Sequence, residues 1–157
     1  MQSQMLYVSW EEVEQMCRGN AERIKNEFKP DLILGIARGG LAPARIMSDL
    51  LDVKTVFIVC AELYKNIGKT GNLKIKQDYP KNALKGKRVL IVDDVSDTGK
   101  TLSEIKGMVG KEALEVRVAT LHYKPHSIFK PDYYSQSTSD WVVYPWEKEE
   151  TKRELKK

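Results

Sequence analysis

The sequence has few of the features that mark membrane-spanning, secreted or disulfide-bonded proteins. No apolar run approaches the ~18 residues that a membrane-spanning helix requires. The amino-terminal stretch MQSQMLYVSW lacks the basic and apolar regions of a signal peptide. There are only two cysteines, Cys17 and Cys60, and we expect both to be reduced packing residues. We therefore expect a cytoplasmic protein with no membrane partner.

The sequence also lacks an extreme charge. Its 157 residues carry a net charge of +4, with 41% hydrophobic and 31% charged residues, as in one soluble globular domain covering residues 1–157. Between Lys65 and Arg88 eight bases accompany a single acid, Asp78. No interleaved aromatic residues there support stacking on single-stranded nucleic acid. A small polyanionic substrate explains this segment at least as well as a nucleic-acid surface, and we expect no nucleic-acid partner.

The stretch from Val89 to Leu102, VLIVDDVSDTGKTL, organises the rest of the chain. Its unbroken apolar run Val89–Val92 suits a strand covered on both faces, as in a parallel sheet. Val95–Gly99 forms a turn, and apolar residues at positions 102, 105 and 109 have helical spacing. The pattern predicts a strand, a polar loop and a helix, and open α/β sheets bind ligands at such a loop.

The chemistry of this loop suits a sugar phosphate. Asp93 and Asp94 can bind ribose hydroxyls or hold a divalent cation. Ser96–Thr101 offers hydroxyls, a glycine and the free amides of a helix start, which together make a phosphate cradle. A helix cap beside two solvated acids would explain any one of these residues, but it does not explain the whole string.

The loop also contains a sequence similar to the end of a Walker loop, GxxxxGK[ST], at Gly99-Lys100-Thr101. The leading glycine of that motif would stand at position 94, where this chain has Asp94. The sequence therefore does not favour a nucleoside triphosphatase.

Hydrophobic patterns predict the remaining elements. Ser9 and Glu12 form a capping box that starts a helix ending near Phe28. A second helix is expected over Pro43–Leu51. The expected strands are Leu6–Val8, Asp31–Ala37, Thr55–Ala61, Glu115–Leu121 and Asp132–Ser135.

The stretch VLIVDDVSDTGKTL closely resembles the phosphoribosyl-pyrophosphate (PRPP) signature of type I phosphoribosyltransferases: an apolar strand, two acids, then D-T-G-x-T. Arg38-Gly39-Gly40-Leu41, after a buried strand, is similar to the pyrophosphate loop of that family. The resemblance implies a cis peptide bond between Ala37 and Arg38. It also implies a PRPP site formed by Arg38, Gly39, Gly40, Asp93, Asp94, Val95, Ser96, Asp97, Thr98, Gly99, Lys100 and Thr101.

The polar segment Glu62–Leu84 has few apolar residues and no sustained period. In the family this position holds a flexible catalytic loop, here about residues 63–81, with Tyr64 and Lys65 at its start. Leu63 stands where family members often have serine. We expect a lid that is mobile without substrate and closes over PRPP.

The carboxyl-terminal third resembles the purine-binding part of xanthine-guanine enzymes. In the Lys124-Pro125 pair, the resemblance implies that the lysine binds the 6-oxo group of a purine. Residues 139–147, SDWVVYPWE, resemble the family's hood, here about 122–147, with Trp141 stacking on the base and the Val142 backbone at its edge. Trp146 is expected to be a core aromatic. Residues 148–157 are expected to be a polar tail that forms a solvated helix turn or a frayed end, and His122 and His126 receive no role.

The expected fold is α/β: a mainly parallel sheet with flanking helices and a small hood from the carboxyl-terminal segment and part of the amino terminus. The implied activity is transfer of the 5-phosphoribosyl group from PRPP to guanine, xanthine or hypoxanthine, which releases pyrophosphate. Asp97 would be the general base near purine N7, and Asp93 and Asp94 would hold Mg²⁺. Family members are usually homodimers or homotetramers. Two alternatives stay open: a PRPP-binding regulator of the same fold, and an adenine or orotate phosphoribosyltransferase.

Overall fold

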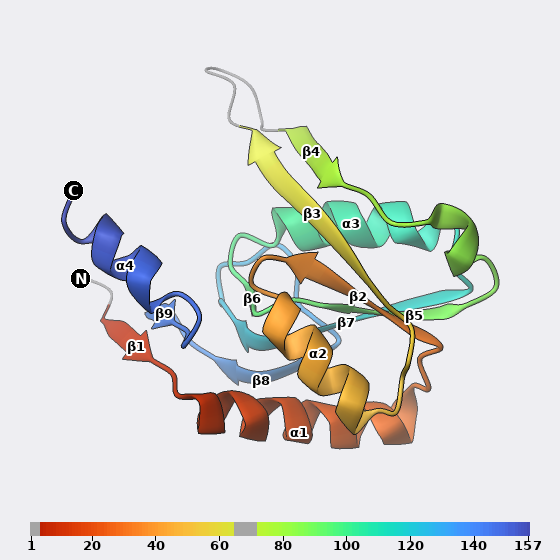
Figure 1. Ribbon diagram of the computed structural model, residues 1–157, viewed down its shortest axis with the longest axis horizontal. Helices are drawn as coiled ribbons and strands as arrows, with labels where there is room; N and C mark the ends of the chain where they lie inside the picture. Colours follow the sequence, from red (N-terminus) through yellow and green to blue (C-terminus); the bar gives the residue numbers. More distant parts are fainter. Residues whose placement is uncertain (1–3, 65–71) are drawn as a thin grey trace.

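Strands of almost wholly apolar sequence form the centre of the main sheet. The computed structural model describes residues 4–64 and 72–157 (Figure 1). The strands are β1 (Met5–Tyr7), β2 (Leu32–Ala37), β3 (Val56–Tyr64), β4 (Asn72–Gln77), β5 (Arg88–Val92), β6 (Val95–Ser96), β7 (Glu115–Tyr123), β8 (Tyr133–Ser137) and β9 (Trp141–Val143). The α-helices are α1 (Trp10–Glu27), α2 (Leu41–Leu50), α3 (Lys100–Gly110) and α4 (Lys148–Glu154), and Lys81–Leu84 forms a short 3₁₀ helix.

The main sheet has seven strands in the order β4-β3-β2-β5-β7-β6, with β8 also paired to β7. Strands β2, β3, β5, β6, β7 and β8 pair in parallel, whereas β4 pairs with β3 in the antiparallel direction. Because β2 and β5 are neighbours and parallel, the loops after Ala37 and Val92 leave the same edge of the sheet. The expected α/β fold with a mainly parallel sheet is confirmed.

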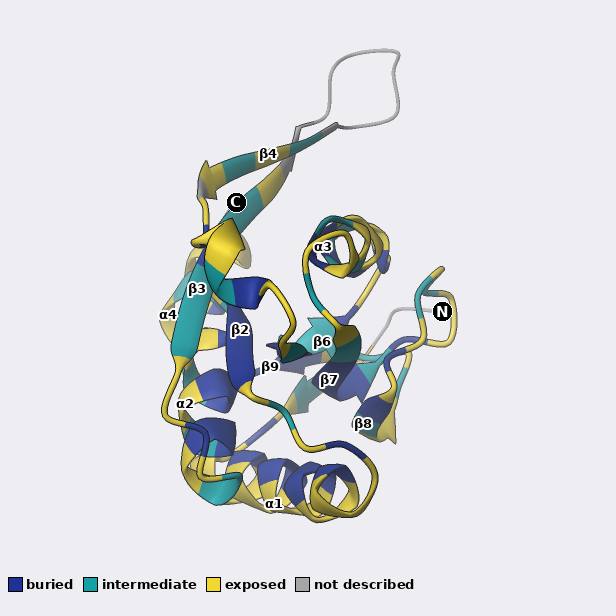
Figure 2. Cartoon of the chain, turned by 90° about the vertical axis from the view of Figure 1, so that its right-hand side faces the viewer, coloured by how far each residue is buried: buried dark blue, intermediate teal, exposed yellow. Residues whose placement is uncertain are grey.

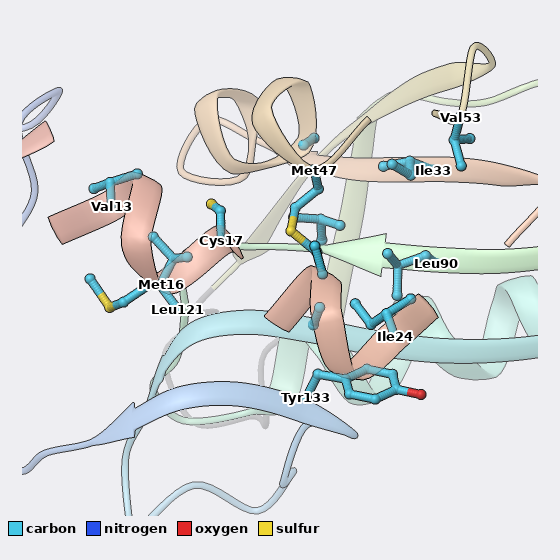
Figure 3. Close-up of a cluster of buried hydrophobic side chains, with 14 of the residues drawn as sticks. Val13, Met16, Cys17, Ile24, Ile33, Met47, Val53, Leu90, Leu121 and Tyr133 are labelled. Atoms are coloured by element: carbon cyan, nitrogen blue, oxygen red, sulfur yellow. The ribbon is translucent and has the colours of Figure 1, made fainter. Parts of the chain in front are cut away.

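Helices cover both faces of this sheet (Figures 1 and 2). On one face α1 and α2 pack with Ile33 and Leu90 into a core that also contains Cys17, Ile24 and Met47 (Figure 3). On the other face α3 buries Leu102, Ile105 and Val109 against strand residues that include Leu34 and Ile91. Alternate residues of one strand therefore enter opposite cores, which explains the continuous apolar runs.

Helix α1 begins as its sequence predicts. The Ser9 hydroxyl accepts a hydrogen bond from the Glu12 amide at 3.2 Å, and the Ser9 amide donates to the Glu12 carboxylate at 2.7 Å. This reciprocal capping box satisfies two backbone donors that have no partner within the helix. One face of the helix enters the core, where these residues are buried: Val13, Met16, Cys17, Ile24 and Phe28. Within residues 4–64 and 72–157, no helix has both the length and the apolar character needed to cross a bilayer.

The amino terminus pairs with the carboxyl-terminal segment. Strand β1 lies parallel to β9 in a separate two-stranded sheet, with Met5 opposite Trp141 and Tyr7 opposite Val143. These are the two segments from which a hood is expected. Strand β8, however, pairs with β7 and belongs to the main sheet, although it falls within residues 122–147.

The interpretation of residues 63–81 as irregular was wrong for strand β4. Asn72–Gln77 pairs with β3, and β3 continues to Tyr64, three residues beyond its predicted end. In the sequence N-L-K-I-K-Q, Leu73 and Ile75 alternate with lysines, and both pack against the core on the α3 face. This short period-two pattern is typical of a half-buried edge strand. Lys65 lies outside the described residues, and Tyr64 ends β3.

Candidate active site

A cavity of about 500 Å³ opens where β2 and β5 end. Residues from both of the loops predicted to bind PRPP line it: Arg38, Gly39, Asp93, Asp94, Val95, Ser96, Asp97, Thr98, Gly99 and Thr101. Of the other described residues predicted for the site, Gly40, Lys100, Lys124, Trp141 and Val142 do not line this cavity. The parallel pairing of β2 and β5 brings the two loops together although more than fifty residues separate them.

The first loop lies so close to the second that side chains are excluded at two positions. A Cβ atom added to Gly39 would lie 2.1 Å from Oδ2 of Asp94, and one added to Gly40 would lie 2.4 Å from the Val92 carbonyl oxygen. Real Cβ atoms do not approach backbone or carboxylate atoms this closely. The predicted cis peptide bond between Ala37 and Arg38 is present. Both glycines are therefore required by steric contact between the two loops.

The acid pair, Asp93 and Asp94, forms part of the cavity wall. The Asp94 amide donates to Asp93 Oδ1 at 2.9 Å, and the Val95 amide donates to Asp94 Oδ1 at 2.7 Å. Burial raises the pKa of Asp94 to about 6, and burial together with the neighbouring Asp94 raises the pKa of Asp93 well above its usual range. Burial and the Asp94 charge also raise the pKa of Glu147 to about 7. Two adjacent carboxylates that ionise reluctantly favour a bound cation.

These two carboxylates have the chemistry that a magnesium ion requires. Mg²⁺ prefers oxygen ligands and is usually bound by one or two carboxylates together with substrate phosphates. Among residues 4–64 and 72–157, no group of three or more histidine, cysteine or acidic side chains forms a complete cage. Asp93 and Asp94 therefore suit a cation whose remaining ligands come from substrate and water.

A buried hydrogen-bond chain fixes the backbone of the acid pair. The Tyr144 hydroxyl donates to the Asp94 carbonyl at 2.9 Å, and His122 Nδ1 lies 2.8 Å from the same hydroxyl. Because a carbonyl only accepts, the hydroxyl proton points to Asp94, and His122 donates from Nδ1. Burial lowers the His122 pKa to about 4, so this imidazole is neutral near pH 7. His122, which received no role from the sequence, therefore supports the loop.

The second half of the loop leads into helix α3. Gly99, the residue before the helix, has a φ of 80°, and an added Cβ would lie 2.4 Å from Ser127 Oγ and 2.6 Å from the Phe129 amide. A glycine is needed there for both its left-handed backbone and its lack of a side chain. Gly99 also provides no side-chain cap. The Lys100 amide donates to Thr98 Oγ1 at 3.4 Å, and the next first-turn amides remain available to an anion. The loop therefore enters the helix with a backbone that only glycine adopts easily, and phosphate binding there stays a prediction.

The residues assigned to the purine lie apart from the cavity lining. Lys124 is buried, and its ammonium group donates to the Asp140 carbonyl oxygen. Trp141 is 52% exposed, whereas Val142, the next residue of β9, is buried in the hydrophobic core. Lys124 thus joins the end of β7 to the turn before β9, and its role toward a base stays a prediction.

Helix α4 is a helix turn of the kind expected in the polar tail and is mostly exposed, but one side of it contacts the site. Glu150 on this helix accepts hydrogen bonds from Arg38 Nη2 at 2.8 and 2.9 Å, and Thr151 is buried. Trp146, Glu147 and Glu150 all line the cavity. Trp146 also stacks on Tyr144, with ring centroids 4.9 Å apart, so it combines the expected packing role with a place at the site. Sequence reasoning missed these contacts because Arg38 and Glu150 are 112 residues apart.

Comparison with known proteins agrees with this geometry. Residues 6–151 match the model of the phosphoribosyl transferase domain. The hypoxanthine-guanine phosphoribosyltransferase of Saccharomyces cerevisiae is 34% identical, over 90% of this chain and 85% of that protein. The xanthine-guanine phosphoribosyltransferase of Cereibacter sphaeroides is 31% identical, over 90% and 86%. The crystal structure of a purine phosphoribosyltransferase from Pyrococcus horikoshii has a TM-score of 0.83 and 41% identity, over 90% of this chain and 93% of that one. The chain therefore belongs to the phosphoribosyltransferase family.

Proposed function

We propose that this protein transfers the 5-phosphoribosyl group from PRPP to a 6-oxopurine and releases pyrophosphate. The observation that carries the proposal is the cavity in which the Arg38 loop, the acid pair and the phosphate cradle meet. Its dimensions are those of a small-molecule site. The similarity to hypoxanthine-guanine and xanthine-guanine enzymes supports guanine, xanthine or hypoxanthine as the acceptor.

The two loops would bind different parts of PRPP. The exposed Arg38 guanidinium and the amides beside it suit the pyrophosphate, whose charge grows as it leaves. The amides and hydroxyls of residues 96–101 suit the 5-phosphate, and Asp93 and Asp94 suit the ribose hydroxyls. When bound to this acid pair, Mg²⁺ would neutralise charge on the pyrophosphate.

Asp97 supplies the acid–base step. Its exposed carboxylate lines the cavity between the acid pair and Gly99. In the reaction the purine N9–C1 bond forms, the C1–O bond to pyrophosphate breaks, and the N7 proton passes to Asp97. A positioned carboxylate contributes about 10²- to 10⁴-fold to such a step.

Lys124, Trp141 and Val142 would select the base. An ammonium group donates hydrogen bonds and cannot accept one, so Lys124 favours a 6-oxo over a 6-amino purine. Trp141 is exposed enough to stack on a ring that enters beside it. The segment 63–81, including Tyr64 and Lys65, would close over bound PRPP and exclude water.

An acceptor screen tests the proposal. Wild-type protein is mixed with Mg²⁺ and PRPP and with guanine, xanthine, hypoxanthine, adenine or orotate, and the nucleotide product is measured. We expect product from at least one of the three 6-oxopurines and none from adenine or orotate. Product from adenine alone would identify an adenine enzyme, and PRPP binding without any product would identify a regulator.

The same proposal includes a cytoplasmic location and a homodimer or homotetramer. The described cysteines, Cys17 and Cys60, form no disulfide, as expected in a reducing compartment. Light scattering of the purified protein measures the assembly directly, and a monomer at working concentration would contradict this part.

A further inference from the structure

His126, which the sequence left without a role, contacts the proposed general base. Its Nε2 atom lies 3.1 Å from Oδ1 of Asp97. Both side chains are exposed, with relative accessibilities of 60% for His126 and 58% for Asp97. The histidine lies outside the cavity lining, whereas Asp97 is part of it. This contact links His126 to the proposed chemistry through Asp97.

The turn that carries His126 is fastened to the phosphate cradle. The Lys124 amide donates to the Ser96 carbonyl and the Ile128 amide to the Thr98 carbonyl, each at 3.0 Å. The hydroxyls of Ser96 and Ser127 lie 2.8 Å apart. These bonds enter the cradle on both sides of Asp97, so the backbone positions of the acid and the histidine are fixed relative to each other.

Stability does not explain the pair. An exposed ion pair or hydrogen bond of this kind contributes little to folding. Its consequence for orientation is larger, because an exposed aspartate otherwise rotates freely about its side-chain bonds. A hydrogen bond to Oδ1 holds the carboxylate in one orientation and leaves Oδ2 to accept a proton.

We infer that His126 is a positioning residue for Asp97, an inference that rests on the proposed phosphoribosyl transfer. The Nε2–H group of His126 donates to Asp97 Oδ1 and orients Oδ2 toward purine N7. As the N9–C1 bond forms and the C1–O bond to pyrophosphate breaks, the N7 proton moves to Oδ2. The His126 proton stays on Nε2 throughout.

Two variants separate this role from a general effect of the turn. His126→Ala removes the donor, whereas the side-chain amide of His126→Gln can donate from a position close to that of Nε2. Ile128→Ala is the matched control, because Ile128 is exposed on the same turn and its backbone bond to Thr98 is retained. Activity with Mg²⁺, PRPP and the best acceptor is measured together with the melting temperature.

We expect His126→Ala to lower kcat about 10- to 100-fold, the cost of a misplaced catalytic group, with KM for PRPP unchanged. His126→Gln should recover most of this loss, and Ile128→Ala should behave as wild type. In an Asp97→Asn background, His126→Ala should have no additional effect, because residues that act as one unit are not additive. All melting temperatures should agree.

Three results would overturn the inference: wild-type kcat in His126→Ala, a Gln variant as slow as the Ala variant, or independent effects in the double variant. Each leaves the proposed function intact, because wild-type protein still forms nucleotide. Absence of transfer by wild-type protein would instead overturn the proposed function and the inference with it.

Discussion

The phosphate side of the site and its base side are built in different ways. The phosphate side, residues 37–40, 93–96 and 98–101, is crowded: Gly39 touches the buried Asp94, and Gly99 touches the turn after Lys124. On the base side, the side chains of Asp97 and His126 and the residue Trp141 are more than half exposed, whereas Lys124 and Val142 are buried. Backbone and steric contact therefore shape the first side in advance, whereas individual side chains, several of them exposed, define the second.

This difference predicts the largest effect for a methyl group added on the phosphate side. Gly39→Ala should abolish transfer and lower the free energy of unfolding by about 1–3 kcal/mol, because the new Cβ would overlap Asp94. Gly107→Ala is the control, since a Cβ at Gly107 meets nothing within 4 Å. Activity assays and urea unfolding measure both. An active, equally stable Gly39→Ala protein would show that the two loops are not rigidly packed.

A substitution on the base side should change selectivity and leave PRPP binding intact. Lys124→Ala should lower kcat/KM for the preferred 6-oxopurine by roughly 10²-fold or more, the cost of losing a specific polar contact to a substrate. Lys130→Ala, on an exposed residue six positions later, should have no such effect. Competition between guanine and adenine measures the change. Unaltered discrimination in Lys124→Ala would remove Lys124 from base recognition.

Two acids that line the cavity, Glu147 and Asp94, also predict a pH effect on stability. Glu147 and Asp94 have pKa values raised to about 7 and about 6, so the folded protein binds their protons more tightly than the unfolded chain. Their contribution to stability is lost as pH rises through these values. His122, with a pKa lowered to about 4, has the opposite dependence, because only the unfolded chain gains its proton near pH 5.5.

From pH 5.5 to pH 8 the acids outweigh the histidine, and the free energy of unfolding should fall by roughly 1–2 kcal/mol. Glu147→Gln should abolish this fall, because Glu147 contributes more to it than Asp94 does and His122 opposes it. Urea unfolding at the two pH values measures it. A rise in stability over the same interval would show that these carboxyl groups are not held in a shared, buried site.

The smallest effect is expected at Arg38, the exposed cation of the phosphate side. Glu150→Gln should lower KM for PRPP by up to about 5-fold, because it removes a competing carboxylate whose exposed ion pair is worth at most about 1 kcal/mol. Glu154→Gln, on the same helix, should leave KM unchanged. Steady-state kinetics with varied PRPP distinguish the two. An increased KM in Glu150→Gln would mean that Glu150 holds Arg38 in its binding position.

Sequence predicted the features that depend on neighbouring residues. The capping box at Ser9, the loop glycines Gly39 and Gly99, and the strand before Asp93 each follow from a short local pattern. Strand β4 was missed because its alternation extends over only four residues, Leu73 to Lys76, amid polar residues.

Contacts made by the fold could not be predicted in this way. Glu150 reaches Arg38, Tyr144 reaches Asp94, and His126 reaches Asp97 across separations of 112, 50 and 29 residues. The spacing of residues within a short stretch does not predict such pairs, because the order of the strands in the sheet brings them together.

Asp97→Asn tests most directly the division between a preformed phosphate side and a chemically active base side. The substitution keeps the size of the side chain and removes the proton acceptor. We expect kcat for the best acceptor to fall about 10²- to 10⁴-fold, while the Kd for PRPP measured with Mg²⁺ by titration calorimetry stays within about 2-fold of wild type. Full activity in this variant, or loss of PRPP binding together with activity, would contradict that division.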